Sequence, residues 1–514
     1  MVGRAADGSR TWDMLIIGGG ATGLGCAIDS ASRGYRTLLV DGSDFAKGTS
    51  SRSTKLIHGG IRYLQQGNVS LVLEALKERG LLRQNAPHLV HDLPFVVPNY
   101  DWWEAPFYGI GLRVYDMLAG KLGFGRSRIL TRDETLERLP TLETKGLRGG
   151  VIYYDGQFDD ARLAINMAQT AAELGGTLLN YARVTDLIKS DDGVVTGARA
   201  TELLGDVELE LRAKVVVNAT GAWSDSIRRM DDPDARSMIQ PSQGVHLVLD
   251  KSFLPGDSAI MVPHTDDGRV LFAIPWYDRV VVGTTDTPVE EALLEPRPLE
   301  EEVEFLLAHT ARYLTKNPTR EDVLSIFAGI RPLVASDGEG ETAALSRDHT
   351  LHITSSGLVT IAGGKWTTYR KMAEDTVDQA ATLAGLEERP CVTRELRIHG
   401  FHQNAGTFGE LEHYGADAPH IRDLFRERPG LEKPLHPRLP HREGVVVWAV
   451  RKEMAVTVED VLARRSRALL WDARAAMEAA PRVASLMAEE LGRDRSWRRD
   501  QVEAFRALAA GYLP

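Results

Sequence analysis

The sequence predicts an α/β protein with a Rossmann-like nucleotide-binding domain, an antiparallel-sheet domain and a helical C-terminal domain. Three observations predict this class: a strand, glycine turn, helix and strand at the start, strand-rich segments from about 241 to 357, and helical patterns after about Pro390. With 514 residues, of which 43% are hydrophobic and 26% charged, the chain can build several substantial cores.

The first unit consists of a strand at Met14–Ile17, a helix at Ala21–Arg33 and a strand at Thr37–Val40. Both strands are short, continuous apolar runs, which suit a parallel sheet that is buried on both faces. The helical pattern stops at Gly34, a residue type that commonly ends a helix. The chain therefore opens with a βαβ unit.

The turn between the first strand and helix carries the motif Gly18-x-Gly20-x-x-Gly23. Glycines at these positions permit the turn and let a pyrophosphate approach the backbone at the helix N-terminus. Asp41 lies 18 residues beyond Gly23, where an acidic side chain can bind a ribose hydroxyl. The motif predicts dinucleotide binding, but it does not separate FAD from NAD.

The middle of the chain alternates between two kinds of sheet. A helix is predicted at Asp160–Glu173, and a buried strand at Val215–Val217 returns to the nucleotide domain. Between them lie four β-like segments of a predicted meander, at Thr177–Leu179, Val184–Lys189, Val194–Ala200 and Val207–Leu211. A strand at Leu358–Ala362, the pair Gly363-Gly364 and a helix at Thr367–Ala384 repeat the opening pattern.

The last part of the chain is predicted to be helical. Thr457-Val458-Glu459-Asp460 is typical of a capping box, and Val483, Leu486, Met487 and Leu491 form an apolar stripe. The expected domains are an FAD-binding domain at 1–95, 145–235 and 355–390, an insertion at 96–144, a substrate domain at 236–354 and a helical domain at 391–514.

Composition excludes several classes of function. The formal charge of −11 disfavours nucleic acid as a partner. Two cysteines, Cys26 and Cys391, cannot build a disulfide framework, and no metal-binding motif occurs, so we expect a cytoplasmic protein without a metal site. No signal peptide is predicted, and the longest uncharged run, Met14–Ile28, is too short to cross a bilayer, so any membrane contact is expected to be peripheral.

Six segments together resemble one family. They are Thr49–Leu64, Asn218–Trp223, Pro275–Trp276, Gly283–Asp286, Gly329–Leu333 and Gly363–Arg370. In this order they resemble the FAD-dependent glycerol-3-phosphate dehydrogenases, which have a glutathione-reductase-like (amino-acid-oxidase) fold. Asp41, where the family often has Glu, and Trp366, where it often has Leu, depart from the pattern. The resemblance implies that FAD is the cofactor.

The resemblance also assigns site residues. Cofactor contacts are expected from Gly18, Gly20, Gly23, Asp41, Thr49, Ser50, Ser53, Lys55, Leu56, His58, Val184, Thr220, Gly221, Gly364 and Thr367. A helix beginning after Gly363-Gly364 would stabilise negative charge on the N1/C2=O side of the flavin during reduction.

A phosphorylated substrate requires fixed cations, because its phosphate is strongly hydrated. The resemblance places Arg62, Tyr63, Arg331 and Lys365 at the substrate, with Arg331 as the main phosphate clamp. The alternative for each cation is an exposed or salt-bridged side chain. His246 resembles the family's flavin-facing histidine and is the candidate base for the C2 hydroxyl, although a purely hydrogen-bonding role is the alternative. The expected catalytic residues are thus His246, Arg331 and Lys365.

The implied reaction is oxidation of sn-glycerol 3-phosphate to dihydroxyacetone phosphate, with hydride transfer from C2 to flavin N5 and electron transfer to a quinone. One alternative is glycerol-3-phosphate oxidase, which uses oxygen and releases hydrogen peroxide. A second is an amino-acid or amine oxidase of the same superfamily, and a third is a flavin-stabilised sensor or assembly factor without substrate turnover.

A quinone acceptor implies a membrane surface. The segment Trp102–Arg128 mixes aromatic, aliphatic and basic residues, as monotopic membrane segments do. We therefore expect a cytoplasmic protein attached peripherally to the inner face of the cell membrane. The alternative is that this segment is an ordinary buried helix and loop over the FAD domain. A homodimer formed through the C-terminal domain is a candidate assembly.

Overall fold

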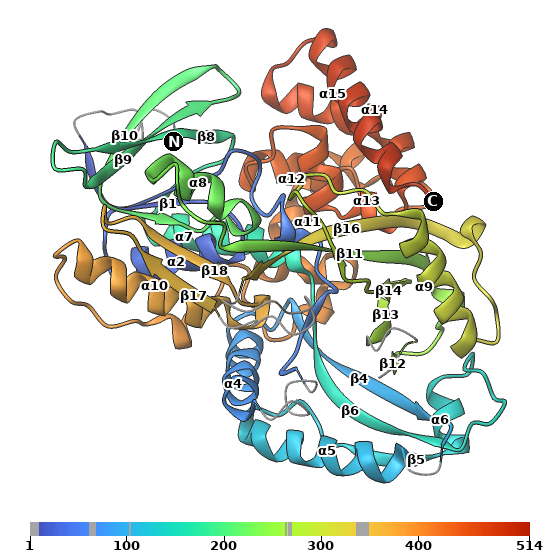
Figure 1. The fold of residues 1–514 in the computed structure, drawn as a ribbon. Helices are drawn as coiled ribbons and strands as arrows, with labels where there is room; N and C mark the ends of the chain where they lie inside the picture. Colours follow the sequence, from blue (N-terminus) through green and yellow to red (C-terminus); the bar gives the residue numbers. More distant parts are fainter. Residues whose placement is uncertain (1–9, 61–67, 102–103, 263–264, 266–269, 336–348) are drawn as a thin grey trace.

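The computed structural model describes residues 10–60, 68–101, 104–262, 265, 270–335 and 349–514. Within these residues the chain forms two sheets and a C-terminal group of helices (Figure 1). This arrangement confirms the predicted fold class. None of the described helices has the length and apolar character needed to cross a membrane.

The first sheet is the nucleotide-binding sheet. Its main order is β17 (His349–Ile353), β18 (Val359–Gly363), β10 (Val207–Asn218), β1 (Thr11–Ile17), β2 (Thr37–Val40) and β7 (Thr177–Leu179). β1 is parallel to both of its neighbours, with Ile17 level with Val40 and Asn218. The parallel pairing confirms the predicted βαβ opening.

Alternate residues of β1 enter different cores. Met14 and Ile16 pack in the cluster that includes helices α2 (Ala21–Ser32), α7 (Asp160–Glu173) and α10 (Tyr369–Leu383). Leu15 and Ile17 pack on the other side, with residues of β8 (Ala182–Lys189) and β9 (Val195–Glu202). The continuous apolar sequence of β1 thus reflects burial on both faces.

The predicted meander is present, with two corrections. The first predicted segment, Thr177–Leu179, does not belong to it, because this segment forms β7 and pairs in parallel with β2. β8, β9 and β10 pair in succession as antiparallel strands. The segments Val207–Leu211 and Val215–Val217, predicted as separate strands, form the single strand β10. Its first half pairs with β9 and its second half with β1, so one strand belongs to both the meander and the parallel sheet.

The second sheet is almost entirely antiparallel. Its main order is β15 (Thr287–Pro288), β11 (Ile239–Asp250), β14 (Arg279–Gly283), β13 (Leu271–Trp276), β12 (Ala259–Val262), β4 (Val90–Asn99), β6 (Gly149–Phe158) and β3 (Leu56–Ile57). β16 (Val323–Val334) pairs with β11, and β5 (Arg128–Thr131) pairs with β6. The strands β3 to β6, which precede residue 236, thus also belong to this sheet. The domain boundaries remain a prediction from the sequence.

The remaining helices before the C-terminal group are α4 (Val69–Asn85), α5 (Glu104–Ala119), α6 (Arg132–Arg138), α8 (Ser224–Asp231) and α9 (Glu300–Tyr313). They include two whose buried side chains pack on faces of the second sheet, α5 and α9. In Figure 1, α5 lies at the opposite end of the molecule from the last helices of the chain.

Helix α5 has two apolar faces. Tyr108, Leu112 and Tyr115 are buried against the protein, whereas Phe107 and Met117 are 52% and 80% exposed. The sequence predicts that aromatic and aliphatic side chains of this segment enter a membrane. The buried side chains, together with Phe124, contradict this part of the prediction, because the protein core already covers them. Trp102 and Trp103 lie outside the described residues.

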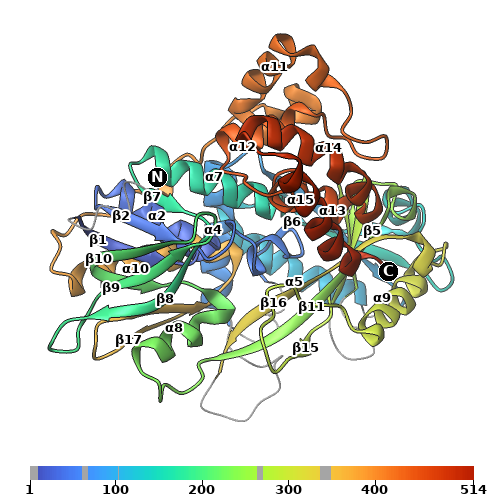
Figure 2. The ribbon, with the colours of Figure 1, turned by 90° about the horizontal axis from the view of Figure 1, so that it is seen from above.

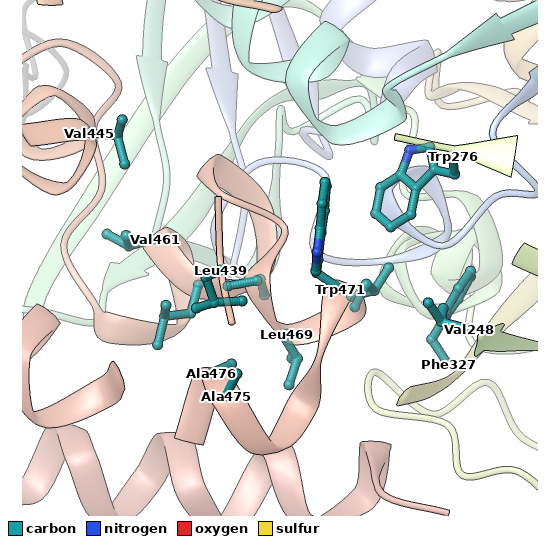
Figure 3. Packing of buried hydrophobic residues seen from close by; sticks show 14 of the residues in the cluster. Val248, Trp276, Phe327, Leu439, Val445, Val461, Leu469, Trp471, Ala475 and Ala476 are labelled. Carbon is teal, nitrogen blue, oxygen red and sulfur yellow. The ribbon is translucent and has the colours of Figure 1, made fainter. Parts of the chain in front are cut away.

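The C-terminal helices form one layer beside both sheets (Figure 2). They are α11 (Ala418–Glu427), α12 (Gly444–Lys452), a π-helical turn (Asp460–Arg465), α13 (Ala468–Trp471), α14 (Ala473–Leu491) and α15 (Arg495–Ala509). The predicted capping box is confirmed: Asp460 N donates to Thr457 Oγ1 at 3.2 Å and Thr457 N donates to Asp460 Oδ2 at 2.9 Å. Figure 3 shows Trp471 of this layer lying toward Trp276, in the cluster that also contains Val248 and Phe327 of the second sheet.

Candidate active site

A cavity of about 660 Å³ lies between the two sheets. From the first sheet it is lined at the carboxyl ends of β1, β2, β10 and β18, which is where open α/β sheets bind ligands. From the second sheet it is lined by Gly244 and His246 of β11 and by Arg331 of β16. A cofactor held by the first sheet would thus face side chains of the second.

The glycine motif forms one end of this cavity. Gly18 has φ +109°, and a Cβ atom there would lie 2.6 Å from the carbonyl oxygen of Ala219. A Cβ atom on Gly23 would collide with the carbonyl oxygen of Gly18, so Gly23 supports the turn from behind and does not line the cavity. Gly20 caps α2 and lines the cavity, which leaves the helix N-terminus open to a pyrophosphate.

Asp41 follows β2 and also lines the cavity. Its carboxyl group accepts hydrogen bonds from Gly19 N at 2.6 Å and Ser43 N at 2.7 Å. Burial raises the pKa of Asp41 to about 6, although these two bonds oppose the shift. The side chain is therefore fixed beside the glycine turn, where it can accept hydrogen bonds from a ribose.

The loop from Thr49 to His58 forms a wall of the cavity. Ser50 Oγ accepts a hydrogen bond from Ala21 N at 2.9 Å, and Thr49 Oγ1 donates to Ile330 O at 2.6 Å. The loop thus joins the first helix to the second sheet. Ser53, Leu56 and His58 also line the cavity.

Lys55 has a different place from the one expected. Its side chain is fully buried, does not line the cavity and donates to Asp160 Oδ2 at 2.7 Å. Burial lowers the pKa of Lys55 to about 8, and the charge of Asp160 opposes that shift. The ammonium group therefore stabilises the shape of the loop, and any cofactor contact at this position comes from the backbone.

The other expected cofactor residues line the cavity from three directions. Val184 comes from β8, while Thr220 and Gly221 follow β10. Gly364 has φ +74°, and a Cβ atom there would collide with the sulfur of Met372. Thr367 lies in a 3₁₀ turn (Trp366–Thr368) that precedes α10, and its Oγ1 accepts a hydrogen bond from His58 N at 3.2 Å.

These residues fit a flavin dinucleotide. Three glycines leave no room for a side chain, a helix N-terminus and an acidic residue lie at one end, and a second turn opens a helix at the other. Residues of both ends line the same cavity.

His246 is held tightly in the wall contributed by the second sheet. Its Nε2 is 2.9 Å from Thr54 Oγ1, and its ring stacks on Phe327 with centroids 4.7 Å apart. Gly283 lies opposite in β14, where a Cβ atom would collide with the imidazole. Burial, followed by the charges of Lys55 and Arg331, holds the pKa of His246 well below its usual value. Its Nδ1 has no hydrogen-bond partner among the described residues.

Arg331 lies in the same wall, on β16. Its Nη1 donates to Asp286 Oδ1 at 3.0 Å and to Gln243 O at 3.3 Å. Its Nη2 donates to Thr284 Oγ1 at 3.0 Å and to Thr285 O at 2.8 Å. A bidentate phosphate clamp therefore requires some of these bonds to be exchanged for phosphate oxygens, and the clamp role stays a prediction.

The structure brings Lys365 into the same cavity, next to Gly364. Arg62 and Tyr63 lie outside the described residues. Sequence reasoning missed three neighbours that shape the site: Thr54, Phe327 and Asp286. Thr54 and Asp286 stand inside the motifs quoted above, but a motif does not indicate which side chains contact one another.

Comparisons with known proteins agree with this geometry. A family model described as FAD dependent oxidoreductase matches residues 13–370, and one described as the C-terminal domain of alpha-glycerophosphate oxidase matches residues 360–498. The chain is 40% identical over 529 residues to mitochondrial glycerol-3-phosphate dehydrogenase of Homo sapiens, covering 96% of this chain and 72% of that protein. The mitochondrial enzyme of Arabidopsis thaliana is 42% identical over 543 residues, covering 97% and 86%.

Solved structures show the same relationship. Glycerol-3-phosphate dehydrogenase from Bacillus halodurans, complexed with FAD, superposes with a TM-score of 0.81 at 30% identity, covering 100% of this chain and 97% of that one. L-alpha-glycerophosphate oxidase from Mycoplasma pneumoniae, with FAD bound, gives a TM-score of 0.59 at 16% identity, covering 76% and 99%. The second likeness concerns the fold alone.

Proposed function

Because the chain belongs to the family of FAD-dependent glycerol-3-phosphate dehydrogenases, we propose that it oxidises sn-glycerol 3-phosphate at C2 and passes the electrons to a quinone. The product is dihydroxyacetone phosphate. The observation that carries the proposal is a single cavity in which a dinucleotide turn faces His246, Arg331 and Lys365.

The residues divide the work of cofactor binding. When bound, FAD supplies the acceptor, at N5, for the hydride that leaves C2. The glycine turn and the N-terminus of α2 would hold its pyrophosphate, and Asp41 would hold its ribose. The backbone after Gly364, at the start of a helical turn, would stabilise the negative charge that the flavin gains on reduction.

Groups that belong to or follow strands of both sheets bind the substrate, and His246 of the second sheet deprotonates it. Arg331 and Lys365 attract the phosphate, together with Arg62 and Tyr63 of the family motif. His246 is neutral at pH 7 because its pKa is depressed, so it can accept the C2 hydroxyl proton. The Thr54 hydroxyl, whose Oγ1 lies 2.9 Å from Nε2, holds the imidazole ring in place for this transfer.

A quinone dissolved in a bilayer requires contact with the membrane surface, and the outer face of α5 supports this contact. Phe107, Ile110, Val114 and Met117 recur at helical spacing and are all exposed. The alternative of an ordinary buried helix accounts for Tyr108 and its neighbours but not for this second face. We accordingly propose that the protein lies at the inner face of the cell membrane. We also propose a homodimer, which sedimentation velocity tests.

Anaerobic addition of glycerol 3-phosphate to the holoenzyme tests the proposal. The visible absorption band of the flavin should bleach, and a soluble quinone should restore it faster than oxygen does. Faster recovery with oxygen would favour the oxidase alternative. Bleaching by amino acids but not by glycerol 3-phosphate would favour the amino-acid or amine oxidases. No bleaching by any of these compounds would leave the flavin-stabilised sensor or assembly factor.

A further inference from the structure

A buried carboxylate, Glu302, lies outside the cavity in the first turn of α9. The side chain belongs to a residue only 3% exposed, and it forms no ion pair with any residue that the structure describes. Burial of an unpaired charge is costly unless hydrogen bonds satisfy it. Here four donors do so: Gln243 Nε2 at 2.7 Å, Thr285 Oγ1 at 2.8 Å, Thr287 Oγ1 at 2.7 Å and Leu299 N at 2.9 Å.

The same two chain segments hold the guanidinium group of Arg331. Its four hydrogen-bond acceptors described above are Gln243 O, Thr284 Oγ1, Thr285 O and Asp286 Oδ1. Glu302 binds the side chains of two of these residues and that of Thr287, which directly follows Asp286. It therefore ties β11 to the turn after β14, and both contribute acceptors to Arg331.

Strand register explains why a single carboxylate can reach both segments. Gln243 of β11 lies opposite Thr287 of the short strand β15, and Ser242 lies opposite Arg331 of β16. The Thr285 hydroxyl also accepts a hydrogen bond from Val245 N at 3.0 Å, which adds a further link between the turn and β11. α9 thus reaches Arg331 through two residues rather than by direct contact.

We propose that Glu302 is the positioning residue for the phosphate-binding site, acting through Gln243 and Thr285 on the orientation of Arg331. This inference rests on the proposed function. Glu302 acts through hydrogen-bond geometry. Its Oε2 accepts from Gln243 Nε2 and Leu299 N, and its Oε1 accepts from the hydroxyls of Thr285 and Thr287. Each of these hydroxyls can rotate and accept a hydrogen bond from an amide instead. Glutamine at this position can therefore keep most of the contacts, whereas alanine keeps none.

The test compares Glu302→Ala with Glu302→Gln, and the matched control is Glu301→Ala. Glu301 is the preceding residue of the same helix and is exposed. Each variant is assayed as FAD-loaded holoenzyme, with KM and kcat for glycerol 3-phosphate measured separately. We expect Glu302→Ala to raise KM by about tenfold or more, which is the scale for loss of a residue that orients a ligand-binding group. Glu302→Gln and Glu301→Ala should stay within about threefold of wild type.

A double variant separates positioning from general destabilisation. If Glu302 acts through Arg331, Glu302→Ala should add almost nothing in an Arg331→Ala background, because coupled residues are not additive. An unchanged KM in folded Glu302→Ala, or a full additional loss in the double variant, would overturn the inference. If Glu302→Ala does not fold, Thr287→Val takes its place, with an expected rise in KM of about fivefold to about tenfold, clear of the range of the controls, and the same contrary outcomes.

The controls also separate this inference from the proposed function. A wild-type flavin that glycerol 3-phosphate does not bleach would overturn both proposals. If the wild type oxidises glycerol 3-phosphate and Glu302→Ala has the same KM as the wild type, only the role of Glu302 is overturned.

Discussion

Replacing the outer face of α5 tests the membrane surface directly. We choose Phe107→Ser, Ile110→Ser and Met117→Ser, because these side chains are 52%, 67% and 80% exposed while the opposite face of the helix is buried. Full burial of one such side chain is worth about 1.5 to 3 kcal/mol, and the three exposed portions amount to about two whole side chains. If half of that surface enters the headgroup boundary, the loss is about 1.5 to 3 kcal/mol, or about tenfold to about 150-fold in partitioning.

Flotation of the holoenzyme with anionic liposomes at low salt measures this loss. The matched control removes three exposed apolar side chains elsewhere, with Leu203→Ser and Leu204→Ser in the turn between β9 and β10 and Val207→Ser at the start of β10. We expect the control to float with wild type and the α5 variant to remain in the dense fraction. Equal partitioning of the α5 variant and wild type, or no partitioning of wild type, would refute the reasoning and strengthen the oxygen-reducing alternative.

The remaining predictions concern the site and its support. Arg331→Ala should lower kcat/KM by about 30-fold to about 5,000-fold with FAD retained, since a lost charge-assisted bond to a buried phosphate costs about 2 to 5 kcal/mol. Arg331→Lys should recover part of the lost kcat/KM, and unchanged steady-state kinetics would remove this residue from the phosphate site. His246→Ala should slow flavin reduction at saturating substrate by about 10²-fold to about 10⁴-fold, more than it weakens binding; a stopped-flow rate within about threefold of wild type would leave the residue a positioning role at most. Arg467→Ala breaks a buried ion pair and should cost about 3 to 5 kcal/mol of stability, with a lower FAD-to-protein ratio; a variant with wild-type Tm and FAD content would contradict this. Burial lowers the pKa of His88 and His441 to about 4, so below pH 6.5 the unfolded chain binds protons before the folded chain does. Stability is therefore lost as the pH falls toward 4, by about 2 kcal/mol for each residue at pH 5, and a Tm that does not fall between pH 7 and pH 5 would contradict this direction.

Local patterns in the sequence were sufficient for the elements that hold the dinucleotide. The helix Asp160–Glu173 and the strand Thr177–Leu179 have the predicted bounds, because apolar periodicity and turn residues determine them within a few residues. The glycine motif and Asp41 could be placed for the same reason. Their geometry depends on one turn and on two neighbouring strands.

Strand pairing over long distances could not be predicted in this way. The strands β4 and β6 carry no signal of the sheet they join, and β6 lies in the second sheet although the sequence favours the nucleotide domain for it. Lys55 shows a second limit. It stands inside the flavin motif, yet its side chain donates to Asp160, which lies more than 100 residues later. A motif identifies a place in the chain and not the partner of each side chain.

The role of the C-terminal helices follows from charges that no motif indicates. Arg464 Nε and Arg465 Nη2 donate to Asp44 at 2.5 and 3.0 Å, and Arg467 Nη2 donates to Asp160 at 2.9 Å. Although burial favours the protonated acid, Arg465 and Arg464 hold the pKa of Asp44 at about 2.

Asp44 and Asp160 bind the C-terminal helices on either side of part of the cavity wall, which the loop from Thr49 to His58 forms. Asp44 lies shortly before this loop in the chain, and Asp160 binds Ser53 and Lys55 within it. If the C-terminal helices unfolded, two buried carboxylates would lose arginine partners, and burial of unpaired charge is strongly unfavourable. The C-terminal layer and the flavin loop are therefore expected to fold as one unit, so that thermal release of FAD and unfolding of these helices coincide.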